Sequence, residues 1–233
     1  MDYDFQKKGV ITLLEHLKKD VCEIAKKAQR DGLCKHKSGN FSGRDKDSGL
    51  FVFTPSGIDR ELLTPRDMII VDKDVRVVEN LSNLKPTSEL LMHLKIYEKR
   101  PDVMAVVHTH SKYATSFAVL SKPIPAIVYE LQALGAKEGY VPVAPYGRPG
   151  TLDLANKVAS ACINSDVALM EKHGSVGVGK DIYDAYLKVS YLEELAEIYY
   201  YVLTLNGGKN PDILPASEIV KWAYPKEVIL SKQ

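Results

Sequence analysis

The sequence predicts an α/β protein in which helices cover a layered sheet of mixed or antiparallel strands. Apolar residues recur at helical spacing over residues 12–30. Two short apolar runs, residues 68–71 and 75–78, are separated by three polar residues, as in a hairpin. Strand-like and helix-like segments then alternate irregularly along the chain. This irregular order favours antiparallel pairing within a layered sheet over a strict repeat of β-α-β units.

The N-terminal half is expected to hold two helices and three strands. The first helix is amphipathic and can end at Gly32. The second helix begins with hydroxyl and carboxylate side chains, which bind the free N–H groups of a helix start. Residues 36–48 are polar, and we expect a loop there. The elements, in order, are helix 12–30, strand 50–54, turn 55–57, strands 68–71 and 75–78, and helix 88–99.

The C-terminal half continues the same alternation. A strand-like run leads into His108, and a later extended segment contains Pro142, which cannot lie inside a helix. Two further strands flank His173, and the last and longest helix is rich in tyrosine. The elements, in order, are strand 103–108, helix 111–120, extended segment 141–144, helix 151–164, strands 167–170 and 175–178, and helix 181–205.

Composition excludes several classes of protein. The 233 residues are 45% hydrophobic, and no linker or repeat divides them, so we expect one domain over residues 1–233. A formal net charge of +1 gives no electrostatic reason to bind nucleic acid or a membrane. The three cysteines are widely spaced, and neither a signal core nor a membrane-spanning run occurs. We expect a soluble cytoplasmic protein with reduced thiols.

Histidines give the first indication of chemistry. His108 and His110 are two residues apart on an extended chain, so their side chains point to the same face and can converge on one ion. His173 supplies a third imidazole, and Glu89 lies upstream. Imidazole nitrogens suit Zn²⁺, Co²⁺ or Mn²⁺, and three of them leave a position for substrate. The short spacing of His108 and His110 by itself also allows a structural pair. The other histidines, His16, His36 and His93, are interpreted as structural, with His93 packing in its helix.

Small polar residues and tyrosines form two further groups. Glycine turns, hydroxyls and a helix start can bind an anion through backbone N–H groups, although loops are commonly built from the same residue types. The thirteen tyrosines include Tyr129, whose phenol can donate a proton, although tyrosines are also favoured at subunit interfaces. The anion-compatible segments are Gly39-Asn40, Thr54-Pro55-Ser56-Gly57 and Thr87-Ser88.

Five motifs follow one another along the chain: Gly39-Asn40-Phe41-Ser42, Thr54-Pro55-Ser56-Gly57, Lys85-Pro86-Thr87-Ser88-Glu89, His108-Thr109-His110 and His173-Gly174. In this order they resemble the class II aldolase/adducin family, and within it the fuculose-phosphate aldolases. The resemblance extends from the first helix to at least the long last helix. It implies a single three-layer α/β/α domain around a largely antiparallel sheet, assembled as a four-fold symmetric tetramer with active sites between subunits.

The resemblance also implies the roles of individual residues. His108, His110 and His173 would hold Zn²⁺, or Mn²⁺ or Co²⁺, with Glu89 as fourth ligand and then as general acid/base. Tyr129 would protonate the departing aldehyde oxygen across a subunit boundary. Tyr224 is the candidate for aldehyde recognition, although its surroundings differ from the family's pattern. The residues that match phosphate-binding positions are Asn40, Ser56, Gly57, Thr87 and Ser88.

The implied reaction is zinc-dependent cleavage of a ketose 1-phosphate, such as L-fuculose 1-phosphate, to dihydroxyacetone phosphate and a hydroxyaldehyde. Alternatives are an L-ribulose-5-phosphate 4-epimerase, a 5-deoxypentulose-1-phosphate aldolase and a methylthioribulose-1-phosphate dehydratase. Glu89 and Tyr129 count against the epimerase, which typically has aspartate at the position of Glu89. A non-catalytic, adducin-like interaction domain would be expected to lack the metal ligands, and all of them are present here.

Overall fold

The computed structural model describes residues 4–220 and the side chains of residues 14–220. Its central sheet has the strand order β4-β3-β2-β1-β5-β10-β9-β8. Every neighbouring pair in that sheet is antiparallel except β8 and β9. The strands are β1 (Asn40–Arg44), β2 (Phe51–Phe53), β3 (Ile69–Val71), β4 (Val77–Glu79), β5 (Ala105–Thr109), β8 (Val143–Ala144), β9 (Val167–Met170) and β10 (Gly174–Gly179), with β6 (Ile124–Pro125) and β7 (Tyr140–Val141) forming a separate pair.

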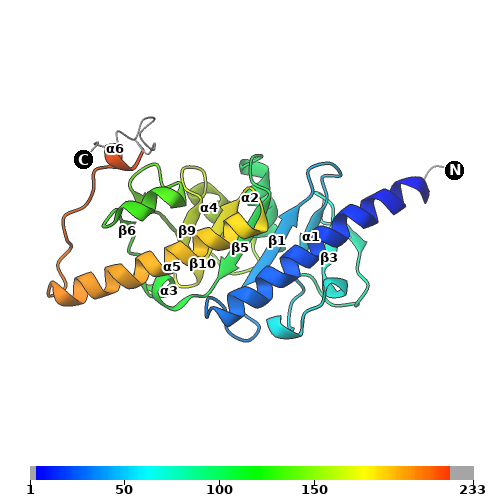
Figure 1. Ribbon diagram of the computed structural model, residues 1–233, viewed down its shortest axis with the longest axis horizontal. Coiled ribbons are helices and arrows are strands. Elements are labelled where there is room, and N and C mark those ends of the chain that lie inside the picture. Colours follow the sequence, from blue (N-terminus) through cyan, green and yellow to red (C-terminus); the bar gives the residue numbers. More distant parts are fainter. Residues whose placement is uncertain (1–3, 221–233) are drawn as a thin grey trace, which may run out of the picture.

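Helices cover both faces of this sheet and give three layers. Helices α1 and α5 cross the strands on one face, where Figure 1 shows them in front of β1 and β10. Helices α2 and α4 pack against each other on the opposite face. The predicted three-layer α/β/α fold with a largely antiparallel sheet is confirmed. The helices are α1 (Asp4–Arg30), α2 (Leu90–Lys99), α3 (Lys112–Val119), α4 (Leu152–Ala161), α5 (Ile182–Leu205) and α6 (Ala216–Ile219), with short 3-10 turns η1 (Arg60–Leu62), η2 (Pro65–Asp67) and η3 (Tyr129–Leu134).

The alternation of side chains along β5 decides which face carries chemistry. Val107 packs in the apolar cluster under α1 and α5, whereas Val106 packs with α2 and α4. Since side chains two residues apart share a face, His108 lies on the face of α2 and α4. The polar residues of β1 follow the same rule: Phe41 lies in the core under α1, and its neighbours Asn40 and Ser42 bond to α2.

The segment that we expected to be a loop, residues 36–48, is only partly one. Its middle forms β1, which lies next to the central strand β5. The prediction was wrong here because Asn40 and Ser42 are polar for a strand; their side chains meet polar partners on α2 instead of apolar ones. Helix α2 begins at Leu90, two residues later than predicted, while the hairpin of β3 and β4 and the strand β9 are confirmed.

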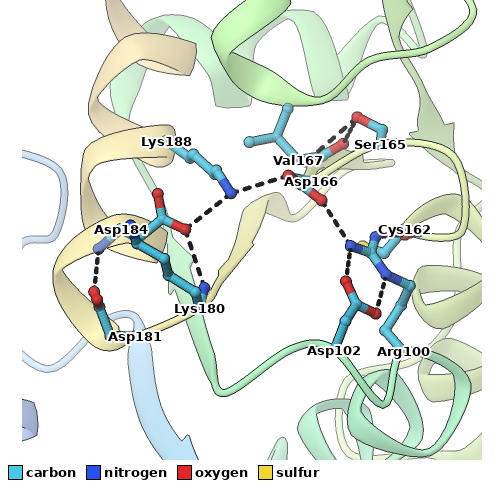
Figure 2. A network of polar contacts seen from close by, with 10 residues as sticks. All are labelled: Arg100, Asp102, Cys162, Ser165, Asp166, Val167, Lys180, Asp181, Asp184 and Lys188. Carbon is cyan, nitrogen blue, oxygen red and sulfur yellow. Dashed lines mark hydrogen bonds and ion pairs between the residues drawn. The ribbon is translucent and has the colours of Figure 1, made fainter.

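A charged network fixes the ends of several elements (Figure 2). Asp166, just before β9, accepts hydrogen bonds from Arg100 after α2 (2.9 Å) and from Lys188 of α5 (2.9 Å). Arg100 also donates to the carbonyl oxygen of Cys162 at the end of α4 (2.7 Å). His173 follows the opposite end of β9, so this network and the histidine cluster lie at different ends of one strand. Within residues 4–220, no helix is long and apolar enough to span a membrane.

Candidate metal centre and active site

Three imidazoles converge where β5 ends and where the chain turns from β9 to β10. The ligating atoms of His108, His110 and His173 all lie within 4.8 Å of one another. Nδ1 of His108 lies 2.8 Å from the carbonyl oxygen of Ser175. Because a carbonyl oxygen only accepts, this nitrogen carries the proton, and Nε2 is left free to ligate. That Nε2 lies 2.9 Å from Nε2 of His110, so the predicted convergence of these two side chains is confirmed.

Gly174 permits this close approach. A Cβ at this position would lie 2.4 Å from the carbonyl oxygen of Thr109 and 3.2 Å from ring carbons of both His108 and His110. Such contacts are too short, so any larger residue would push β10 away from β5. His173 directly precedes this glycine, and the turn therefore brings the third imidazole against the other two.

Glu89 adds a buried carboxylate to the cluster from the start of α2. Its side chain is only 5% exposed. Oε2 lies 3.1 Å from Nε2 of His108, and Oε1 lies 3.5 Å from Nε2 of His173. Oε2 also accepts a hydrogen bond from the Asn40 amide at 2.9 Å. The carboxylate is thus held against two of the three imidazoles without blocking His110, which is the most exposed of them.

Burial and charge set the protonation of the cluster. Burial, together with the neighbouring His108, lowers the pKa of His110 to about 3 and the pKa of His173 to about 4. Burial acts to raise the pKa of Glu89, but His108, His173 and the Asn40 amide outweigh it and hold that pKa below its ordinary value. For His108, burial acts to lower the pKa, and Glu89 reverses this and raises it. The site therefore combines an ionised carboxylate with neutral imidazoles at His110 and His173, the form that binds metals.

The donor set fits a metal ion. Oε1 of Glu89 and Nδ1 of His173 are buried and have no hydrogen-bond partner among the residues that the structure describes. Buried polar atoms are nearly always paired, so such atoms beside three converging imidazoles indicate a missing partner. Three imidazole nitrogens with one carboxylate suit Zn²⁺, Mn²⁺ or Co²⁺. The arrangement is open on the side of His110, as a catalytic site requires.

A second layer of hydrogen bonds lies behind Glu89, and the sequence interpretation missed it. His93 is fully buried in α2, and its Nε2 lies 2.6 Å from Oδ1 of Asn40. Because that oxygen only accepts, Nε2 carries the proton, and Nδ1 accepts from the Ser42 hydroxyl at 2.7 Å. Tyr97 continues the chain with 2.8 Å between its hydroxyl and that of Ser42. His93 does not merely pack in its helix, since it fixes the orientation of the amide that donates to Glu89.

The segments predicted to bind phosphate lie next to one another. Pro55 and Pro86 form a β-bridge, and the backbone N–H of Ser56 donates to the carbonyl oxygen of Lys85 at 2.8 Å. Ser56, Gly57 and Ser88 are exposed, and Asn40 and Thr87 are 5% and 7% exposed. Asn40 donates one amide hydrogen to Glu89, and its Oδ1 bonds to His93, so its second amide hydrogen is the one left for a phosphate. The role of Asn40 toward phosphate stays a prediction.

Of the two tyrosines from the sequence interpretation, the structure describes Tyr129. Tyr129 begins η3, which packs against α5, β7 and α6, and it is 38% exposed. Its expected role across a subunit boundary stays a prediction. Tyr224 lies outside the described residues.

Known proteins resemble this chain over most of its length. Residues 19–200 match the family described as Class II Aldolase and Adducin N-terminal domain. An L-fuculose phosphate aldolase of Methanococcus maripaludis is 40% identical over 167 residues, which cover 72% of this chain and 87% of that protein. A 5-deoxy-D-ribulose 1-phosphate aldolase of Bacillus thuringiensis is 34% identical over 211 residues, or 91% and 95% of the two chains. The solved structure of an L-fuculose 1-phosphate aldolase matches with a TM-score of 0.81 and 34% identity over 88% and 93% of the two chains. The chain belongs to the class II aldolase and adducin family.

Proposed function

We propose that this protein is a zinc-dependent class II aldolase that cleaves a ketose 1-phosphate to dihydroxyacetone phosphate and an aldehyde. The observation that carries the proposal is the buried carboxylate of Glu89 against the three-imidazole cluster. The named relatives are class II aldolases, which are lyases, and this chain shares their family. L-fuculose 1-phosphate is the first candidate substrate, since one named relative and one solved structure carry that activity in their names.

In this proposal, Glu89 moves the proton that carbon–carbon cleavage requires. Its lowered pKa keeps the carboxylate ionised at neutral pH, which is the form that a general base requires. The Asn40 amide and the imidazoles fix its position, which limits the reorganisation needed during reaction. A bound Zn²⁺ would be held by His108, His110 and His173, with Glu89 as the resting fourth ligand, and would stabilise the negative charge that develops on the dihydroxyacetone phosphate half.

The phosphate would lie against Asn40, Ser56, Gly57, Thr87 and Ser88. Ser56, Gly57 and Ser88 are exposed beside the buried Asn40 and Thr87, so the two serine hydroxyls can reach a ligand. Binding energy from the phosphate would orient the reacting carbons relative to Glu89. We further propose a cytoplasmic homotetramer, in which Tyr129 of one subunit reaches the site of its neighbour and protonates the departing aldehyde oxygen.

A second candidate is an aldolase for 5-deoxypentulose 1-phosphates. The relative with that activity in its name covers 91% of this chain, more than the L-fuculose phosphate aldolase reported above. Both reactions release dihydroxyacetone phosphate and share the cluster and the phosphate site. They differ in the aldehyde half alone.

The test is a coupled assay for dihydroxyacetone phosphate, with L-fuculose 1-phosphate and 5-deoxy-D-ribulose 1-phosphate supplied separately. Protein treated with a chelator and then reloaded with Zn²⁺, Mn²⁺ or Co²⁺ serves as its own control. We expect activity to be lost on chelation and restored best by Zn²⁺. Tyr129→Phe should retain metal and cleave more slowly; unchanged cleavage would remove Tyr129 from the proposed mechanism. No release of dihydroxyacetone phosphate from either substrate by metal-loaded protein would overturn the aldolase proposal and favour the epimerase or the dehydratase.

A further inference from the structure

Arg60 is a buried cation whose hydrogen bonds all go to backbone. It is 2% exposed, and among the described residues its guanidinium forms no ion pair with a carboxylate. The neighbouring Asp59 bonds instead to Gln29 and to the N–H of Glu61. A guanidinium has five N–H donors, and all five are used here. The accepting carbonyl oxygens are those of Lys37 (3.0 Å), Ser38 (3.4 Å), Gly39 (2.5 Å), Pro55 (3.2 Å) and Ile58 (3.3 Å).

These carbonyls belong to two segments that are far apart in sequence. The first segment, residues 37–39, ends directly before Asn40. The second runs from Pro55 to Ile58 and contains Ser56 and Gly57. Nη1 bonds to both ends of this second segment and so closes it as a turn. Within this segment Gly57 has φ +79°, a conformation that favours glycine and allows a tight turn. The hydrogen bonds from Arg60 hold this turn in place.

No described carboxylate forms an ion pair with Arg60, and the neighbouring Asp59 acts on its charge only from beyond ion-pair distance. Burial lowers the pKa of the guanidinium, but from an ordinary value so high that it remains charged at neutral pH. A buried charge without an opposite charge is costly even when fully hydrogen-bonded, because carbonyl dipoles only partly replace water. An anion that binds on the other side of the two segments would offset this cost. A sugar phosphate carries such a charge.

We propose that Arg60 is a positioning residue for the phosphate of the substrate. Arg60 holds the segments that carry Asn40, Ser56 and Gly57 in fixed positions relative to each other. Its buried charge is balanced when the phosphate binds. This inference rests on the proposed function, in which these segments hold the phosphate. It adds a cation to a phosphate site that the sequence predicted from glycine turns, hydroxyls and a helix start.

The experiment compares Arg60→Lys and Arg60→Met with the same changes at Arg100. Lysine keeps the charge and loses the five-donor fork, and methionine loses both. Arg100 is the matched control, because it too donates to a backbone carbonyl, that of Cys162, but lies in the network around Asp166 (Figure 2). Each variant is measured for thermal unfolding, bound zinc, kcat and KM for the phosphorylated ketose, kcat/KM for the same ketose without phosphate, and Kd for inorganic phosphate.

For Arg60→Met we expect KM and the Kd for phosphate to rise by about tenfold or more, with bound zinc retained and kcat changed much less. Arg60→Lys should fall between this variant and the wild type. The preference for the phosphorylated over the unphosphorylated ketose should shrink, which a merely structural role would not cause. The Arg100 variants should unfold at lower temperature and bind phosphate as the wild type does.

Folded Arg60 variants with wild-type phosphate affinity would overturn the inference and leave the aldolase proposal standing. An equal loss of kcat/KM for both ketoses would also overturn it, because the effect would then not concern phosphate. If the wild type binds phosphate in an Arg60-dependent way but cleaves no ketose 1-phosphate, the proposed function fails and the inference stands. Wild-type protein that binds no phosphate would overturn the inference together with the predicted phosphate site.

Discussion

Asn40 of β1 lies directly opposite His108 of β5 in the antiparallel register of the two strands. Residues opposite each other on neighbouring strands have side chains on the same face. This pairing places an amide beside the imidazole cluster, and the amide donates to Glu89 at the start of α2. The register of β1 and β5 thus brings the segment that contains Asn40 next to the candidate metal site and to Glu89, the proposed proton-transfer group. The position of Glu89 depends on strand pairing as well as on its own helix.

The first prediction concerns His93, which orients the Asn40 amide. In His93→Phe, Oδ1 of Asn40 loses its buried partner, and the hydroxyl of Ser42 keeps only the hydroxyl of Tyr97. We expect kcat to fall by about 10–100-fold, because the amide can then rotate away from Glu89. Stability should fall by about 1–3 kcal/mol. Activity assays, zinc analysis and urea unfolding check this.

Tyr97→Phe is the matched control for His93, since it removes only the last hydroxyl of the same chain. We expect a smaller loss of kcat than in His93→Phe. A His93→Phe protein that is folded, carries zinc and turns over at the wild-type rate would show that the chain has no effect on Glu89.

The second prediction separates the charge of Glu89 from its place at the metal. Glu89→Gln keeps the size of the side chain and can still accept from Asn40 through its amide oxygen. Much of the metal should remain, because the three imidazoles remain. Turnover should fall by about 10²–10⁴-fold, the range typical for loss of a general acid or base. His108→Ala is the comparison, since it should lose both metal and turnover; near-normal turnover in Glu89→Gln would exclude Glu89 from proton transfer.

The sequence predicted the convergence of His108 and His110 because it depends only on local geometry. Residues two apart on a strand share a face whatever surrounds them, and this holds for His108 and His110. Strands β9 and β10 were predicted from apolar runs for a similar reason. The hairpin of β3 and β4 followed from its polar turn.

Features that depend on partners from other elements were missed. Strand β1 is too polar to be recognised, since Asn40 and Ser42 are suited to a strand only when α2 supplies His93 and Tyr97 as partners. Arg60 likewise looks like an ordinary surface arginine until the fold brings five carbonyl oxygens around it. The hydrogen-bond partners of such residues come from distant segments of the chain, so the sequence pattern of one segment does not predict them.

The third prediction concerns the network in Figure 2. Asp166→Ala leaves Arg100 and Lys188, both largely buried, without their shared carboxylate. We expect a loss of about 1–3 kcal/mol in the free energy of unfolding, reduced from a fully buried pair by partial solvent exposure. Activity should be retained at a temperature where the variant is folded, because the network lies at the other end of β9 from His173.

Asp153→Ala is the control for Asp166, since Asp153 pairs with Lys157 on the exposed surface of α4. Its cost should be below about 1 kcal/mol. Urea unfolding measures both variants. Equal destabilisation would mean that the buried Asp166 network contributes no more to the free energy of unfolding than an exposed pair.

The fourth prediction concerns stability at alkaline pH. Burial raises the pKa of the Cys162 thiol to about 12, whereas an unfolded cysteine ionises near pH 8.5–9. Between these values the folded state keeps a proton that the unfolded state has lost, so the free energy of unfolding decreases as the pH rises. This thiol alone contributes a slope of about −1.4 kcal/mol per pH unit above pH 9.

Cys162→Ala lacks this contribution and differs from the wild type at pH 7 by a packing cost that is independent of pH. Urea unfolding of both proteins from pH 7 to pH 11 should therefore show the variant gaining on the wild type above pH 9, and parallel curves would show that the thiol ionises equally in both states.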